Sequence, residues 1–327
     1  MTTYKEIFGK YVKNYSSDPT ADIEGQVWYN TTSGTFKSEV LVADAWASGG
    51  NMGTARQLLT GAGTQTAGLG IGGYIDGSSN TGATEEYNGA TWSPGGSLGT
   101  ARRDSAGCGT QTAGLAVGGN TSSPAEVTNV EEYDGSSWAG GGALPVGTRQ
   151  MAAAGIQTAA LMFGGNFQFD VTTGITRSYD GSTWTTGGTM GTARGNLSGA
   201  GIQTAALAFG GSAYPGNPVR NLTEEYDGSS WAAGGNLNTA RNRLGGAGIQ
   251  TAALAFGGGT PTITGATELY NGTSWTASTS MTTARNNLGN AGTQTAGLAI
   301  GGQTTANSAA TEEFTGAALT VKTITTS

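Results

Sequence analysis

Short apolar runs that end at a pair of glycines alternate along most of this chain with polar stretches punctuated by glycine. In one unit, the apolar run 203–211 (QTAALAFGG) is followed by 222–231 (LTEEYDGSSW). Such runs are typical of β-strands, and Asp-Gly between two of them indicates a tight hairpin, because both central residues of a type I′ turn need positive φ. With the small residues 195–201 as an inner strand, the unit predicts four antiparallel strands.

This unit recurs six times at nearly constant intervals. Each copy contains a GTAR-like phrase, then GxQTAxLxxGG, and in five copies a Tyr followed by Asn-Gly or Asp-Gly and a Trp. The arginines of the first phrase, spaced 44 to 47 residues apart, are Arg56, Arg102, Arg149, Arg194, Arg241 and Arg285, and the tryptophans are Trp92, Trp138, Trp184, Trp231 and Trp275. Repeats of this length with four strands predict a β-propeller; a β-solenoid is the alternative, but its coils are shorter and parallel.

The repeat resembles the kelch family of propellers, whose blades carry a glycine pair that closes the second strand, then a Tyr and a Trp. One copy here has Gly210, Gly211, Tyr226 and Trp231 at these positions. The resemblance implies an all-β, six-bladed propeller with four-stranded blades over residues 39–327. Because an open ring would leave an exposed strand edge, we expect the strand at 41–46, which contains Trp46, to pair with the last blade so that the N- and C-terminal strands close the ring.

The first 38 residues form a separate segment, because they hold four of the five lysines of the chain. Their sequence predicts an extended lead followed by a hairpin, with GQVWYN and TFKSEV on either side of residues 32–34. This segment resembles the leader of structural proteins of tailed, especially marine, bacteriophages, through Asn14, Tyr15, Pro19, Glu24, Gly25, Gln26, Trp28, Tyr29, Asn30, Thr32 and Gly34. The resemblance implies a docking and assembly segment at 1–38, with Tyr15, Pro19, Gln26, Trp28 and Tyr29 as its candidate contacts.

Composition excludes several classes of function. The net charge of −7 makes binding to nucleic acid unfavourable, and no apolar stretch is long enough for membrane insertion. The single Cys108 permits no internal disulfide and is expected to be a buried small residue. The chain has no histidine, and its paired glutamates recur from repeat to repeat rather than forming one asymmetric site. We therefore expect no enzymatic activity, no metal and no cofactor.

The repeated arginines admit two interpretations. A ring of guanidinium groups binds acidic glycans, whereas pairing of each arginine with a glutamate of the TEEY phrase stabilises the fold. The structural role is favoured, because unpaired buried arginines are costly.

The segments between the glycine pair and the TEEY phrase differ between repeats in length and character. They are the loops between the second and third strands, so all six are expected on one face, where recognition residues commonly lie. The candidate contacts for a ligand or receptor are the aromatic residues Tyr74, Phe167, Phe169 and Tyr214.

The sequence thus predicts a non-enzymatic structural protein of a phage virion, most simply a tail fibre, spike or adhesin component. Its leader would dock to other virion proteins and its propeller face would bind a host receptor or glycan, with a homo-oligomer expected in the particle. Three alternatives remain: a capsid decoration or head-fibre protein, a polysaccharide-degrading propeller enzyme, and a cellular kelch-type adaptor.

Overall fold

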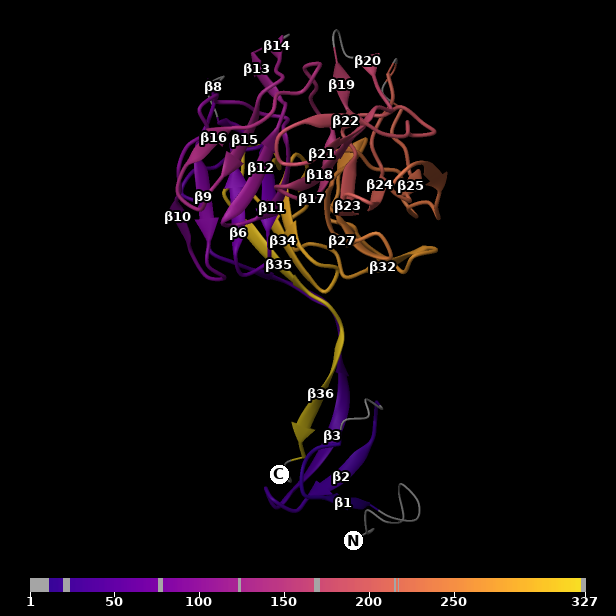
Figure 1. Cartoon of the computed structure of the whole chain (residues 1–327). Helices are drawn as coiled ribbons and strands as arrows, with labels where there is room; N and C mark the ends of the chain where they lie inside the picture. The colour runs from indigo at the N-terminus through magenta and orange to yellow at the C-terminus, as the bar shows by residue number, and fades with distance from the viewer. Residues whose placement is uncertain are drawn as a thin grey trace. The chain divides into compact units, whose positions relative to one another are not determined.

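The computed structural model describes residues 12–19, 24–75, 79–122, 125–167, 171–214, 216 and 218–324. The chain forms two compact units, one of residues 46–315 and one of residues 1–45 together with 316–327. The regular secondary structure of the described residues consists of β-strands, and none of these residues forms a helix (Figure 1). The division between the units falls between Ala45 and Trp46, and the described residues 316–324 belong to the smaller unit.

The larger unit contains six four-stranded sheets whose strands pair antiparallel, which we number in chain order. Sheets 1 to 3 are β5 (Thr60–Gly63), β6 (Gly68–Ile71), β9 (Thr84–Tyr87) and β10 (Trp92–Pro94); β11 (Ala106–Thr110), β12 (Ala113–Val117), β15 (Val130–Tyr133) and β16 (Trp138–Gly140); and β17 (Ala152–Ile156), β18 (Ala159–Phe163), β21 (Thr176–Tyr179) and β22 (Trp184–Thr186). Sheets 4 to 6 are β23 (Ser198–Ile202), β24 (Ala205–Phe209), β25 (Thr223–Tyr226) and β26 (Trp231–Ala233); β27 (Gly245–Ile249), β28 (Ala252–Phe256), β31 (Thr267–Tyr270) and β32 (Trp275–Ser278); and β33 (Gly289–Gly292), β34 (Ala296–Ile300), β35 (Thr311–Thr315) and β4 (Ala45–Ser48).

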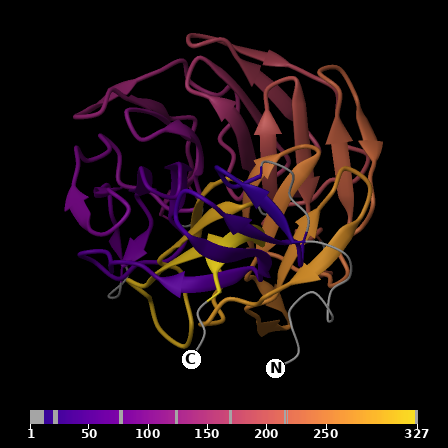
Figure 2. The ribbon, with the colours of Figure 1, turned by 90° about the horizontal axis from the view of Figure 1, so that it is seen from below.

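The predicted all-β fold with repeated four-stranded sheets is confirmed. The first strand of each sheet contacts the first strand of the next, and β33 of sheet 6 also contacts β5 of sheet 1. Figure 2 shows these sheets arranged around a common centre. Small residues are required there: a Cβ added to Gly61 would lie 2.5 Å from the carbonyl oxygen of Asn290. The arrangement is compatible with a propeller.

One glutamine per repeat links each sheet to the preceding one. Gln203, for example, donates from Nε2 to the carbonyl oxygens of Ala160 at 3.0 Å and Tyr179 at 2.6 Å. The same double contact is made by Gln65, Gln111, Gln157, Gln250 and Gln294. Because Gln65 of sheet 1 bonds to Gly297 and Phe314 of sheet 6, the first and last sheets are linked like any other pair.

The tryptophans make a second set of hydrogen bonds from each sheet to the preceding one. The indole nitrogens of Trp46, Trp92, Trp138, Trp231 and Trp275 donate to a threonine hydroxyl of the preceding sheet at 2.8 to 3.0 Å. Trp184 instead donates to the carbonyl oxygen of Gly142 at 2.8 Å, since Val130 stands where the other sheets have this threonine. Trp46 on β4 therefore makes in sheet 6 the same hydrogen bond that the repeated tryptophans make in their own sheets.

The second glutamate of the TEEY phrase accepts a hydrogen bond from a tyrosine of the next sheet. The hydroxyls of Tyr87, Tyr133, Tyr179 and Tyr270 lie 2.5 to 2.6 Å from Glu313, Glu86, Glu132 and Glu225. Sheet 5 has Leu269 at the glutamate position, and the following sheet has Phe314 where the others have tyrosine. Donor and acceptor are thus absent together, which leaves neither group unpaired.

The first glutamate of the phrase pairs with the repeated arginine of its own sheet. Arg56, Arg102, Arg194, Arg241 and Arg285 are fully buried and contact Glu85, Glu131, Glu224, Glu268 and Glu312. Burial lowers the pKa of Arg56 to about 10. The ion pair offsets part of the cost of removing these charges from water.

Arg149 does not belong to this set. Its backbone pairs with Asn166, as that of Arg103 pairs with Asn120, so Thr148 holds the place that the buried arginines hold elsewhere. Arg149 Nε lies 3.2 Å from Glu126 Oε1 instead. The third repeat also has Arg177 in place of the first glutamate, so this sheet lacks both partners of the buried pair.

The smaller unit is a four-stranded sheet in the order β1 (Lys13–Tyr15), β2 (Val27–Asn30), β3 (Thr35–Val42) and β36 (Ala318–Thr323). Strands β2 and β3 form the predicted hairpin around residues 32–34. Trp28 is fully buried and donates from Nε1 to Asp18 Oδ1 at 3.1 Å. Asp18 also accepts from Asn30 and Lys37, and these bonds, that of Lys37 first, lower the pKa of Asp18.

Removing one buried arginine should destabilise the larger unit strongly. Arg194→Ala leaves the buried Glu224 without its cation, and we expect the free energy of unfolding to fall by about 3–5 kcal/mol. Chemical denaturation measures this. The control is Arg177→Ala, whose guanidinium bonds to Thr186 at the surface and whose loss should cost less than about 0.5 kcal/mol. Equal effects of the two substitutions would contradict the structural role of the buried pair.

The tyrosine–glutamate bonds should make stability sensitive to alkali. Burial, with the glutamate acceptor second, raises the pKa of Tyr133 from 10.0 to about 12. Tyr133 therefore contributes stability that is fully present below pH 10 and lost as the pH rises through 12. We expect Tyr133→Phe to reduce the fall of Tm over this range, measured by calorimetry against pH.

Tyr226→Phe is the matched control for Tyr133→Phe, because Ser178 occupies the position of the glutamate in the preceding sheet. The expectation for Tyr133 is wrong if the Tm profiles of wild type and Tyr133→Phe are parallel above pH 10.

Candidate binding site at the centre of the sheets

Six residues, one from each repeat, form a ring of backbone hydrogen bonds, which we call the mouth ring. Its members are Leu58, Asp104, Gln150, Asn196, Arg243 and Asn287. Each backbone N–H donates to the carbonyl oxygen of the preceding member at 2.8 to 3.1 Å, and Leu58 donates to Asn287. The six main-chain donors at this position are therefore used within the ring, so a ligand here must be recognised by side chains.

The mouth ring has a strained backbone. Its six residues have φ between 53° and 57°, and every other described residue with a φ in the left-handed region is a glycine. A side chain in this conformation costs roughly 1–2 kcal/mol, less for Asn and Asp. The chain thus uses glycine wherever positive φ serves only a turn, and keeps side chains at this ring. Strain retained in this way is characteristic of functional sites.

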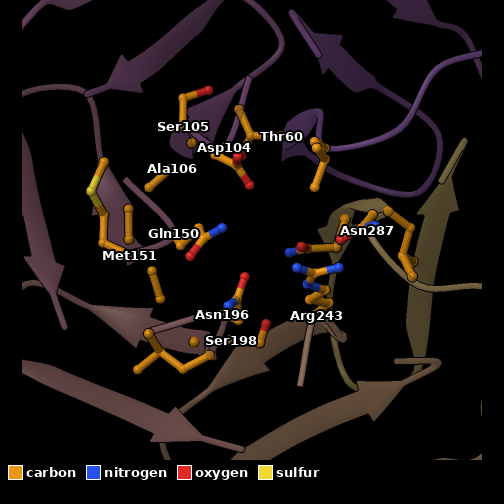
Figure 3. Close-up of a pocket in the computed structure, with 18 of the residues that line it drawn as sticks. Thr60, Asp104, Ser105, Ala106, Gln150, Met151, Asn196, Ser198, Arg243 and Asn287 are labelled. Carbon is orange, nitrogen blue, oxygen red and sulfur yellow. The ribbon is translucent and has the colours of Figure 1, made fainter. Parts of the chain in front are cut away.

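The side chains of the mouth ring line a cavity of about 110 Å³ together with Ser105, Ser198 and Thr60. Figure 3 shows Asp104, Gln150, Asn196, Arg243 and Asn287 placed around this cavity. Asp104 and Arg243 are three steps apart in the ring and so occupy opposite positions. The volume corresponds to about four water molecules, which suits one or two functional groups of a ligand.

Asp104 carries the buried charge of the site. Its side chain is 7% exposed, and Arg103 Nε lies 3.7 Å from its Oδ2. Burial raises the pKa of Asp104, and the nearby charges of Arg149, Arg103 and Arg243 act in the opposite direction. The carboxylate is therefore kept at a cost to folding, as expected of a group retained for binding.

The variable loops adjoin the mouth ring. The residue before each ring member pairs with the first residue after the glycine pair, as Gln57 does with Tyr74 and Arg149 with Asn166. In the part of these loops that the structure describes, four two-stranded hairpins are found: β7 (Tyr74–Ile75) with β8 (Ser79–Asn80), β13 (Asn120–Ser122) with β14 (Ala125–Glu126), β19 (Asn166–Phe167) with β20 (Val171–Thr172), and β29 (Gly259–Thr260) with β30 (Thr262–Ile263). The labelled hairpin strands β8, β13, β14, β19 and β20 project on one side of the larger unit (Figure 1).

The aromatic candidates lie in these loops but in three different repeats. Tyr74 is half-buried, with the guanidinium carbon of Arg103 5.0 Å from its ring centre. Phe167 is half-buried in β19, Tyr214 is half exposed, and Phe169 lies outside the described residues. No described contact joins Tyr74, Phe167 and Tyr214 into one cluster, and their role in binding remains a prediction.

Sequence reasoning missed the mouth ring. Its members follow the GTxR phrase by two residues in five repeats and by one residue in the third. At this position otherwise similar repeats differ in chemistry: Leu, Asp, Gln, Asn, Arg and Asn. Aligning the repeats would have exposed this position, whereas attention to loop length and aromatic residues did not.

The described residues offer little else for chemistry. Cys108 is buried, and burial raises the pKa of its thiol to about 12. Within the described part of the chain, His, Cys, Asp and Glu form no group of three that could hold a metal ion. A search of the same residues for a helix long and apolar enough to span a membrane also finds none.

Removing the charge of Asp104 should stabilise the protein. Because the folded-state pKa is raised, the charged carboxylate opposes folding above that pKa and the penalty disappears as the pH falls below the unfolded value of 3.8. We expect Asp104→Asn to raise Tm at pH 7 and to have the Tm of the wild type near pH 3. A lower Tm of Asp104→Asn at pH 7 would show instead that the arginines dominate.

Comparison of the chain with protein-family models and with curated proteins finds no match to either. The resemblance of the repeat to kelch blades and of the leader to phage proteins therefore rests on the residues quoted above. Function must be inferred from the geometry of the site and from these residues.

Proposed function

We propose that the larger unit is a six-bladed, kelch-like propeller that binds a ligand at the mouth ring and the adjoining loops. The observation that carries this proposal is the mouth ring, where five polar side chains are retained at positions that favour glycine. The glutamine, tryptophan and tyrosine links between the sheets support it, because they make a rigid frame that fixes these side chains before a ligand arrives.

A binding function is favoured over catalysis. Among the described residues that line the cavity, Asp104 is the one carboxylate, whereas glycoside hydrolysis uses a pair of carboxylates that flank the bond to be broken. The chain also lacks histidine, the commonest general base. We therefore place the protein among non-enzymatic recognition modules.

The setting that we propose for this module is a phage virion, as a tail fibre, spike or adhesin component that contacts the host surface. Support comes from the resemblance of residues 14–34 to the leaders of phage structural proteins. The smaller unit would dock to other virion proteins and support a homo-oligomer, and it exposes Val40, Leu41, Val42 and Val321 on β3 and β36. A capsid decoration or head-fibre protein is the second candidate, because the same leader serves it equally well.

Incorporation into particles tests the docking role. Trp28→Ala removes the buried centre of the smaller unit, and we expect particles to lose the protein while the larger unit stays folded. Tyr214→Ala, an exposed change in a loop of the larger unit, should leave incorporation unchanged. Mass spectrometry of purified particles measures incorporation, and normal levels of the Trp28→Ala protein would refute docking through this unit.

Cryo-electron microscopy of the same particles separates the two virion roles. Density at a tail tip or fibre supports recognition of the host. Density spread over the capsid lattice supports decoration, and absence of the protein from every particle would overturn the virion assignment.

A further inference from the structure

One of the described guanidinium groups at the mouth ring has no carboxylate close to it. Arg103 lies 3.7 Å from Asp104, and Arg149 lies 3.2 Å from Glu126. Among the described residues no carboxylate lies within ion-pair distance of Arg243, which is exposed at the ring opposite Asp104. A guanidinium without an ion-pair partner at the cavity of a protein of net charge −7 indicates an anionic group on the ligand.

The remaining polar atoms at the ring indicate which other chemical groups the ligand carries beside its anionic group. Asn287 donates through Nδ2 to Gln57 and Gln303, which leaves its buried Oδ1 without a donor, and the buried Ser105 hydroxyl also has no partner. Asn287 is 7% exposed. An unpaired buried acceptor costs about 1–3 kcal/mol, and a ligand hydroxyl would recover this cost once the Asn287 amide turns its Oδ1 into the cavity. Asp104, two positions from Asn287 around the ring, is a second acceptor, so the ligand must bring hydrogen-bond donors as well as an anion.

The size of the cavity limits how the ligand enters. About 110 Å³ holds a carboxylate and a neighbouring hydroxyl rather than a whole sugar chain, so recognition is of a terminus inserted end-on. Capture of a peptide's carboxyl terminus commonly uses main-chain N–H groups, but those of the mouth ring are already bonded to one another. Hydroxyl donors beside a carboxylate are a property of acidic sugars.

Resting on the proposed binding function, we propose that the mouth ring binds the terminal, carboxylate-bearing sugar of a glycan. Arg243 pairs with the carboxylate and the Asn196 amide donates to it. Asp104 and Asn287 Oδ1 accept from the sugar hydroxyls. The aromatic ring of Tyr74, held by Arg103 beside the ring, is placed to contact the following sugar.

Calorimetry on the full-length protein tests this with oligosaccharides that end in glucuronate, galacturonate or N-acetylneuraminate, each beside a neutral counterpart. We expect at least one acidic probe to bind more tightly than its counterpart and to bind more weakly as salt is added. Arg243→Gln should reduce that affinity about 10- to 100-fold, as expected for a hydrogen bond to a charged group. Arg177→Gln, a partly exposed arginine of sheet 3, should leave it unchanged.

Three outcomes overturn the inference. The first is that no acidic probe binds more tightly than its neutral counterpart, and the second is that Arg243→Gln, with an unchanged Tm, binds as well as wild type. The third is that a peptide with a free carboxyl terminus binds more tightly than every sugar and loses this affinity in Arg243→Gln.

A second experiment measures how much wild-type and Arg243→Gln protein is retained on the surface polysaccharide of host cells. It separates this inference from the proposed function. Equal retention of wild type and Arg243→Gln would overturn the inference and leave the binding function standing. Retention of neither protein, with acidic probes bound in calorimetry, would overturn the proposed contact with the host surface and leave the chemistry of the mouth ring standing.

Discussion

Hydrogen bonds between neighbouring sheets are the interaction on which the larger unit depends. Each sheet is too small to bury its own faces, so its apolar residues pack against the next sheet, as Phe209 of sheet 4 packs against Trp275 of sheet 5. The glutamine and tryptophan links then fix the angle and register of this packing. Because the same links join sheet 6 to sheet 1, no sheet is left with an unpartnered face.

These links explain why so much of the sequence repeats. A glutamine whose amide reaches two carbonyl oxygens cannot change without leaving them unpaired. At two of the places where the pattern breaks, both partners change together. Leu269 comes with Phe314, and Thr148 comes with Arg177. Repetition in this chain thus marks structural contacts, and the absence of repetition at an otherwise constrained position is the basis of the proposed binding site.

The mouth ring combines two features that cost folding free energy. Its residues hold side chains in a backbone conformation that elsewhere is left to glycine, and Asp104 is charged where burial opposes charge. A frame with many inter-sheet bonds can sustain such local costs, because the neighbouring strands fix the conformation of the ring. The asymmetry of the six side chains gives a nearly symmetric scaffold one defined orientation for a ligand.

The sequence alone determined the strands, the four-stranded sheets and the hairpin of the smaller unit, because strand alternation, glycine pairs and Asn-Gly or Asp-Gly turns act over a few residues. Only the tertiary structure showed that Arg149 lies outside the buried arginine set and that Trp28 is fully enclosed. It also brought Asp104 and Arg243 to opposite sides of one cavity. These facts depend on the register of residues from separate repeats around a common centre, which no local pattern encodes.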